Sequence, residues 1–195
     1  MRSRRQTPKS RIRLYGFWAV LAVPAVIVIL QYRSDILVYG EALKLSGQWA
    51  AGLLLLTLAI SPFRKLTARY RVKWDTLWLL RLRRPLGVAV FGYSILHLII
   101  YLEKKADIRR IASESFEWEL LTGWIAFFIF LPLAVTSRDS FIRKLGRNWK
   151  KLHNWVYLGA ILTALHWVLT AFDPMMAYIF LGIIIATLLT RFLKA

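Results

Sequence analysis

Six long apolar segments, separated by short basic loops, constrain this chain more than any other feature. They cover approximately residues 14–31, 43–60, 86–102, 120–135, 153–171 and 175–193. Each is close to the roughly 17–25 residues that an α-helix needs to cross a hydrocarbon core. A backbone in lipid must satisfy its own hydrogen bonds, which helices do within one segment. We therefore predict an all-α, polytopic bundle of six transmembrane helices.

Composition supports one membrane domain. Hydrophobic residues make up 58% of the chain, against about 45–50% in ordinary soluble domains. Nine Trp and eight Tyr are also present, and both residue types favour membrane–water interfaces. We predict a transmembrane domain over residues 14–193, preceded by a basic cytoplasmic tail over residues 1–13. The chain has no Cys, which excludes disulfides, thiolate-held iron–sulfur clusters and covalent haem attachment through Cys-x-x-Cys-His.

Four of the prolines bear on the helix boundaries. Pro24 and Pro132 lie inside apolar segments and are predicted to kink them. Pro62 follows the second segment and Pro174 precedes the sixth, so both are predicted to mark helix ends.

The distribution of positive charge predicts the orientation. The net charge is +18, and 22 of the 28 Lys and Arg residues lie in the N-terminal tail, two loops and the C-terminus, all on one side of the predicted membrane. Eight of the ten acidic residues lie on the opposite side. The positive-inside rule then places both termini in the cytoplasm. Because the charge lies between apolar segments rather than in a recognisable binding motif, we expect no nucleic-acid partner.

The only three histidines, His97, His153 and His166, all lie inside or at the edge of apolar segments. Ionisable residues at membrane depth are costly and often functional, and imidazole is a common haem ligand. The alternative for any one of them is a hydrogen-bonded packing residue. His153 and His166 are 13 residues apart, or roughly 20 Å along one continuous helix. This spacing predicts two levels at which a redox centre can be held.

Aligning the third and fifth segments by depth pairs His97 with His166 and Arg84 with His153. We predict a bis-histidine haem at the outer level. At the inner level His153 has no histidine opposite it, because a guanidinium stays protonated and offers iron no lone pair. Arg84 is either a partner for a haem propionate or a cytoplasmic anchor of its helix. On an ideal helix the side chains of His153 and His166 point about 140° apart around the axis. The two histidines therefore do not lie on the same face of such a helix.

Several short motifs are distributed along the apolar segments: Gly47-Gln48-Trp49-Ala50, Ser61-Pro62, Arg83-Arg84-Pro85-Leu86-Gly87, Phe91-Gly92-Tyr93, Leu96-His97, Trp149-Lys150-Lys151-Leu152-His153, Tyr157 and His166. The most specific of them is the Trp-Lys-Lys-Leu-His element followed by a histidine 13 residues later. Together they resemble the MsrQ family, whose members are haem-binding membrane subunits of the periplasmic methionine sulfoxide reductase system. This family belongs to the ferric-reductase-like transmembrane group, and the resemblance covers about residues 14–193.

This resemblance implies a bacterial inner-membrane protein that binds one or two b-type haems, with His97, His166 and His153 as iron ligands and Arg84 in the slot of a fourth histidine. It also implies FMN, electrons from quinol or a flavin reductase, and delivery to the periplasmic molybdopterin enzyme MsrP, which reduces methionine sulfoxide. No catalytic residue is expected in the chain itself. The sequence lacks a dinucleotide fingerprint. Basic residues within 64–73 or 143–151 are candidates for the FMN phosphate, although loops that only orient the protein have the same composition.

Other functions remain compatible with these residues. A ferric or cupric reductase would pass electrons to a metal ion, and a transporter or scaffold would bind no haem. The predicted outer loop, residues 103–119, has five acidic and four basic residues. It is either a docking site for the electron acceptor or a solvated loop.

Overall fold

A computed structural model describes residues 8–70, 77–105 and 107–190. Every regular element in these ranges is an α-helix, so the all-α prediction is confirmed for the described part of the chain. In chain order the helices are α1 (Pro8–Arg33), α2 (Tyr39–Arg69), α3 (Leu77–Lys105), α4 (Ile108–Glu114), α5 (Trp118–Val135), α6 (Asp139–Leu145), α7 (Arg147–His153), α8 (Val156–Thr170) and α9 (Met175–Leu189).

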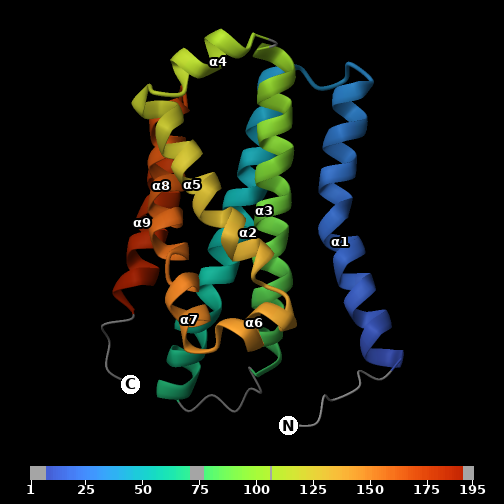
Figure 1. Ribbon diagram of the computed structural model, residues 1–195, viewed down its shortest axis with the longest axis vertical. Coiled ribbons are helices and arrows are strands. Elements are labelled where there is room, and N and C mark those ends of the chain that lie inside the picture. Colours follow the sequence, from blue (N-terminus) through green and yellow to red (C-terminus); the bar gives the residue numbers. More distant parts are fainter. Residues whose placement is uncertain (1–7, 71–76, 106, 191–195) are drawn as a thin grey trace.

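The long helices form two groups that meet along the bundle axis (Figure 1). Helix α2 packs along α3, whereas α5 packs on α8 and α8 on α9. Contacts of α3 with α5 and of α2 with α9 join the two groups. The short helix α4 lies across one end of the bundle, and α6 and α7 lie at the other end, where α1 begins and α9 ends (Figure 1). We call these the α4 end and the α6–α7 end.

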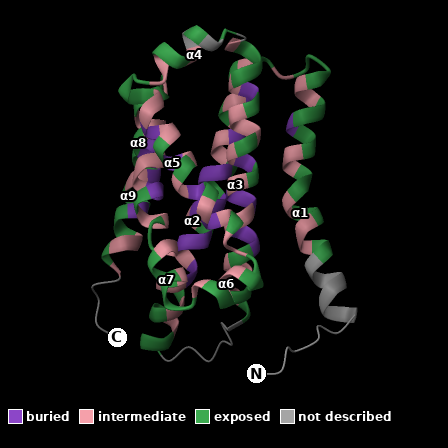
Figure 2. Cartoon of the chain, viewed as in Figure 1, coloured by how far each residue is buried: buried purple, intermediate pink, exposed green. Residues whose placement is uncertain are grey.

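Figure 2 shows the buried residues gathered on the helices along the bundle axis. Many large hydrophobic residues are exposed on the outside. The main core joins α2, α3, α5, α8 and α9 and contains small residues such as Ala160 and Ala164 beside larger ones such as Leu54. Val20 and Leu30 of α1 are 68% and 61% exposed. Such a broad apolar exterior suits lipid rather than water.

Four helices, α1, α2, α3 and α5, have segments long and apolar enough to cross a membrane. The fifth and sixth apolar segments form α8 and α9, each with 15 residues. At 1.5 Å per residue such a helix is about 22 Å long, shorter than a hydrocarbon core of roughly 30 Å. Six membrane-spanning helices therefore remain a prediction.

The prediction that His153 and His166 share one continuous helix is wrong. Helix α7 ends at His153, and α8 begins three residues later at Val156. Between them the backbone changes to shorter i→i−3 hydrogen bonds, from Trp155 N–H to the Leu152 carbonyl and from Tyr157 N–H to the Asn154 carbonyl. This local tightening interrupts the regular α-helix. The rotational mismatch of the ideal helix therefore does not apply to the two histidines.

The prediction that Pro62 marks a helix end is also wrong, because α2 continues past it to Arg69. A proline removes one backbone hydrogen bond, but a long helix packed in a bundle tolerates that loss. Pro24 and Pro132 lie inside α1 and α5, and Pro174 immediately precedes α9, as predicted. Helix α1 already begins at Pro8, so the second half of the predicted tail, residues 1–13, is helical; residues 1–7 lie outside the described range.

Tyr93 of α3 joins the peripheral helix α1 to the bundle beside Pro24. Its hydroxyl accepts a hydrogen bond from the Ala25 N–H (3.0 Å) and donates one to the Leu21 carbonyl (2.8 Å). These two backbone groups are four residues apart, so in a regular helix they would bond to each other. The tyrosine hydroxyl is thus inserted into the helix ladder of α1, a known cause of helix bending.

Replacing Tyr93 with Phe is expected to loosen α1 while leaving the aromatic ring in the core. The substitution removes both hydrogen bonds that tie α1 to α3 through this hydroxyl, each worth about 0.5–1.5 kcal/mol. Thermal unfolding in detergent and the rate of disulfide cross-linking between cysteines placed on α1 and α3 would measure the effect. Tyr178→Phe, at an exposed tyrosine of α9, is the control, and an equal loss of stability in both variants would contradict the role of the inserted hydroxyl.

Candidate functional site

His97 of α3 and His166 of α8 lie across the bundle from one another, near the α4 end. Their imidazole ring centres are 6.3 Å apart, and the ring planes are nearly perpendicular, at 89°. The helices α3 and α8 belong to the two different groups, so the pair bridges them. The structure therefore brings together the two histidines that the depth alignment paired.

Each of these imidazoles is held by a backbone carbonyl on its Nδ1 atom. His97 Nδ1 lies 3.0 Å from the Leu43 carbonyl oxygen, and His166 Nδ1 lies 2.7 Å from the Glu119 carbonyl oxygen. A carbonyl only accepts, so Nδ1 carries the proton in both rings and Nε2 keeps its lone pair. An Nδ1–H donated to a carbonyl is the usual second-shell support of a metal-ligating histidine.

Small residues make room for both rings. A Cβ added at Gly123 of α5 would lie 2.8 Å from His166 Cε1 and Nδ1. At Gly47 of α2 it would lie 3.2 Å from the same two atoms of His97. Beside Gly47, the buried Ser46 hydroxyl donates to the Leu43 carbonyl and lies 3.2 Å from His97 Nδ1.

Four supporting residues were missed by reasoning from the sequence: Leu43, Ser46, Glu119 and Gly123. Leu43 and Glu119 act through backbone carbonyls, which every residue carries, so no residue type signals them. Ser46 and Gly123 resemble ordinary small residues of membrane helices.

The spacing of the two rings fits one metal ion shared between their Nε2 atoms. Two metal–nitrogen bonds of about 2.0–2.1 Å, with each ring centre about 1.1 Å behind its nitrogen, put the centres roughly 6 Å apart. The observed separation is 6.3 Å. Among the described residues, no group of three or more His, Cys, Asp or Glu side chains is able to hold a free metal ion. Two neutral imidazoles, one from each helix group, would suit haem iron, for which a protein need supply only one or two ligands.

His153 has different surroundings at the α6–α7 end. Its Nε2 lies 3.2 Å from the Thr136 hydroxyl, and its ring stacks on Trp149 with centres 4.0 Å apart. The Thr136 hydroxyl donates its proton to the Pro132 carbonyl (2.6 Å), so His153 Nε2 is the donor to Thr136 and the lone pair is on Nδ1.

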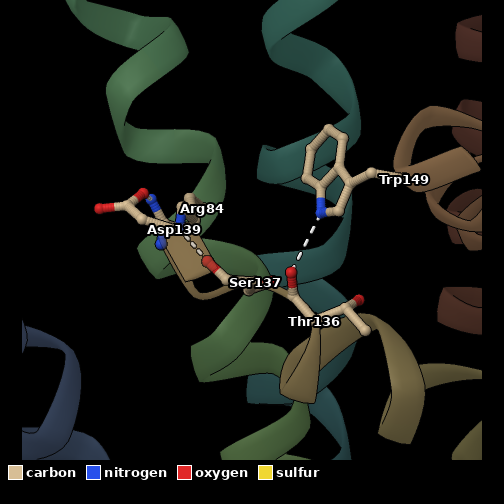
Figure 3. A network of polar contacts seen from close by, with 5 residues as sticks. All are labelled: Arg84, Thr136, Ser137, Asp139 and Trp149. Atoms are coloured by element: carbon tan, nitrogen blue, oxygen red, sulfur yellow. Dashed lines mark hydrogen bonds and ion pairs between the residues drawn. The ribbon is translucent and has the colours of Figure 1, made fainter. Parts of the chain in front are cut away.

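The corner between α5 and α6 is clamped from two sides (Figure 3). From α7, the Trp149 indole Nε1 donates to the Thr136 carbonyl (3.0 Å). From α3, Arg84 donates to the Ser137 carbonyl and forms an ion pair with Asp139. Arg84 and His153 therefore reach neighbouring residues of one corner, and the Arg84 guanidinium already has an anionic partner. A haem propionate as the partner of Arg84 stays a prediction.

Comparison with known proteins identifies the family. The family model of the ferric reductase like transmembrane component matches residues 46–164. The haem-binding subunit MsrQ of a protein-methionine-sulfoxide reductase from Azospira oryzae is 39% identical over 71% of this chain and 60% of its own length. The MsrQ subunit from Ralstonia nicotianae is 34% identical over 82% of this chain and 74% of its own length.

A third relative, the MsrQ subunit from Brucella anthropi, is 35% identical over 76% of this chain and 66% of its own length. The chain thus spans about 60–74% of the length of these relatives. No solved structure matches it. The matched region contains His97, His153 and the apolar helices α3 and α5, and the chain belongs to the MsrQ family of ferric-reductase-like membrane proteins.

Proposed function

We propose that this chain is the membrane electron-transfer subunit of a two-component methionine sulfoxide reductase. It would bind b-type haem and pass electrons from quinol or a flavin reductase to a periplasmic molybdopterin reductase of the MsrP type. The observation that carries the proposal is the His97–His166 pair, with ring centres 6.3 Å apart and both Nδ1 atoms on backbone carbonyls. The relatives named as haem-binding subunits support the same cofactor.

The proposed orientation in the bacterial inner membrane places the α6–α7 end, and both termini, in the cytoplasm. Figure 1 shows that α1 begins and α9 ends at this end. Helices α6 and α7 at this end contain five basic residues, Arg143, Lys144, Arg147, Lys150 and Lys151, whereas most of the described acidic residues lie at the α4 end. Arg33–Glu103 and Lys105–Glu114 ion pairs join helices at that opposite end. This asymmetry supports the proposed orientation through the positive-inside rule, and in that orientation His97 and His166 would lie at the outer level.

In this role the haem, once bound, supplies a one-electron iron couple. His97 and His166 would hold the haem iron through their Nε2 atoms, and the Leu43 and Glu119 carbonyls hold those rings in one tautomer and orientation. Hydrogen bonding of an axial ligand and exclusion of water are two means by which a protein sets a haem potential. The apolar core between the helix groups would exclude water from the haem.

At the inner level we propose a second haem site and an FMN site, each supported by fewer contacts than the His97–His166 pair. His153 is a candidate ligand of a second haem, but its Nε2 is engaged by Thr136 in this structure. The Nδ1 atom, beside the ring substituent, is the nitrogen left for a metal. FMN is proposed as a further cofactor near the basic residues of the α6–α7 end; of the two stretches considered, residues 71–73 lie outside the described range.

The test of this function compares two electron acceptors. Purified, chemically reduced protein is expected to be reoxidised by an MsrP-type reductase in the presence of methionine sulfoxide, much faster than by chelated ferric or cupric ions. Stopped-flow absorbance at the haem bands would follow the reaction. Faster reoxidation by the chelated ions would instead favour a metal reductase, and purification without stoichiometric haem would favour a transporter or scaffold.

The same measurement tests whether the outer loop, residues 103–119, docks the acceptor. Glu117 and Glu119 are exposed there, close to the carbonyl that holds His166. Replacing both with Lys is expected to slow electron transfer at low salt several-fold, because charge steers association. The difference should shrink as salt rises. Equal rates at all salt concentrations would favour a loop that is only solvated.

A further inference from the structure

Arg64 occupies a core-facing position of α2. The residues at the preceding core positions, three or four apart along the helix, are buried: Ser46, Ala50, Leu53, Thr57 and Ile60. Residues with this spacing lie on one face of a helix. Arg64 is the next member of the series, one turn beyond Ile60. The stripe therefore begins at the residue beside His97 and reaches a cation at the α6–α7 end.

The Arg64 side chain has a buried hydrogen-bond donor that is unused. Its Nε atom is shielded from solvent and has no partner within the described part of the chain. A guanidinium keeps its charge and presents donors in a rigid, planar fork. A buried donor without a partner is unfavourable, and native proteins rarely retain one unless a ligand or ion completes it.

The described protein residues offer Arg64 no anion at this end. Asp139 is the acidic residue that the structure places here, and it is paired with Arg84. The other described acidic residues lie at or near the opposite end: Asp35, Glu41, Glu103, Asp107, Glu114, Glu117, Glu119 and Asp173. A partner for the buried Arg64 donor is therefore expected to come from outside the described chain.

The depth of Arg64 suits a group at the inner level. It lies 18 residues beyond Ser46 on α2, or about 27 Å along the axis. Ile60 belongs to the core cluster against which Leu152, the neighbour of His153, also packs. Arg64 thus lies one turn beyond this core residue of α2, on the side away from the His97–His166 pair.

We infer that Arg64 binds a carboxylate or phosphate group at the inner end of the bundle. The anion is a haem propionate, the phosphate of FMN or the phosphate of a lipid headgroup, which share the oxygen pair that a guanidinium fork recognises. The first two sources rest on the proposed function. In this arrangement Arg64 takes the anion-binding role that the sequence suggested for Arg84, and Arg84 holds the α5–α6 corner.

The experiment compares Arg64→Gln and Arg64→Lys with Arg81→Gln, a control at an exposed arginine of the same end. Each purified holoprotein is titrated with FMN and with riboflavin, which lacks the phosphate. Haem retention and haem potential are measured on the same samples. Binding to phosphatidylglycerol vesicles is compared with binding to phosphatidylcholine vesicles. The Gln variant is expected to weaken one of these interactions roughly ten- to a hundredfold, the usual effect of losing a charged hydrogen bond, and Lys should restore it in part.

The outcome identifies the anion. Loss of the preference for FMN over riboflavin assigns the flavin phosphate, altered haem retention or potential assigns a propionate, and loss of phosphatidylglycerol binding alone assigns a lipid. The inference would be overturned if Arg64→Gln and Arg81→Gln behaved alike in flavin binding, in haem retention and potential, and in vesicle binding. The low-spin signal of the His97–His166 haem is recorded in the unmodified protein as well. If that signal is present, a negative result concerns Arg64 alone; if it is absent, the proposed function itself fails.

Discussion

Replacing either His97 or His166 with Ala is expected to abolish the low-spin haem of the outer level. Each substitution removes one of the two imidazoles of the pair. The third histidine of the chain, His153, lies at the other end of the bundle and cannot replace it. Losing a residue that merely supports a metal ligand weakens binding roughly 10–100-fold, so loss of the ligand itself should exceed that range. Absorbance of the oxidised and reduced protein, with EPR of the oxidised form, would measure the change.

His153→Ala is the matched control for these two variants. Its ring lies at the other end of the bundle, against Trp149 and Thr136, so the low-spin signal of the outer haem should persist. If a second haem is present, His153→Ala should remove or alter that signal alone. An unchanged spectrum in both His97→Ala and His166→Ala would sink the assignment of the outer pair.

Replacing Gly123 with Ala is expected to disturb the same haem without removing any ligand. The added Cβ would lie 2.8 Å from two atoms of the His166 ring, closer than side chains pack, so the ring or the helix that carries it must shift. Overpacking of this kind costs about 1–3 kcal/mol. We expect weaker haem retention and a shifted low-spin EPR signal. Gly47→Ala, with its contact at 3.2 Å, should have a smaller effect.

Gly52→Ala controls for the change in helix propensity. An alanine in a helix is favoured over glycine by roughly 0.5–1 kcal/mol, and nothing lies within 4 Å of a Cβ at Gly52. This variant should therefore be at least as stable as the parent and retain its haem spectrum. Equal haem retention in Gly123→Ala and Gly52→Ala would show that His166 has more room than the structure indicates.

The helices were predictable from the sequence where the physical constraint is local. Long apolar segments must form helices in lipid because no other single segment satisfies its own backbone, and α1, α3, α5 and α9 lie where such segments were identified. Pro174 marks the start of α9 for a similarly local reason. Pro62 led to a wrong prediction of a helix end. Its local tendency to end a helix is outweighed by the packing of the long helix α2, which continues past it.

The site was predictable only in outline. Counting residues along two apolar segments predicted that His97 and His166 form a pair, and their rings do lie close together. The assumption of one helix from His153 to His166 was wrong. The carbonyl partners at Leu43 and Glu119 are 54 and 47 residues away in sequence from the rings they hold. No local pattern links such groups, because their approach depends on how whole helices pack.

By itself, the sequence determined an all-helical membrane protein, its charge asymmetry and three histidines inside or at the edge of apolar segments, because hydropathy and charge act residue by residue. Only the tertiary structure decided which nitrogen of each imidazole is free, which arginine is already paired and which glycine makes room for a ring. Those properties belong to contacts between helices distant in sequence. They distinguish His97 and His166, with Nε2 atoms available to iron, from His153, whose Nε2 is engaged by Thr136.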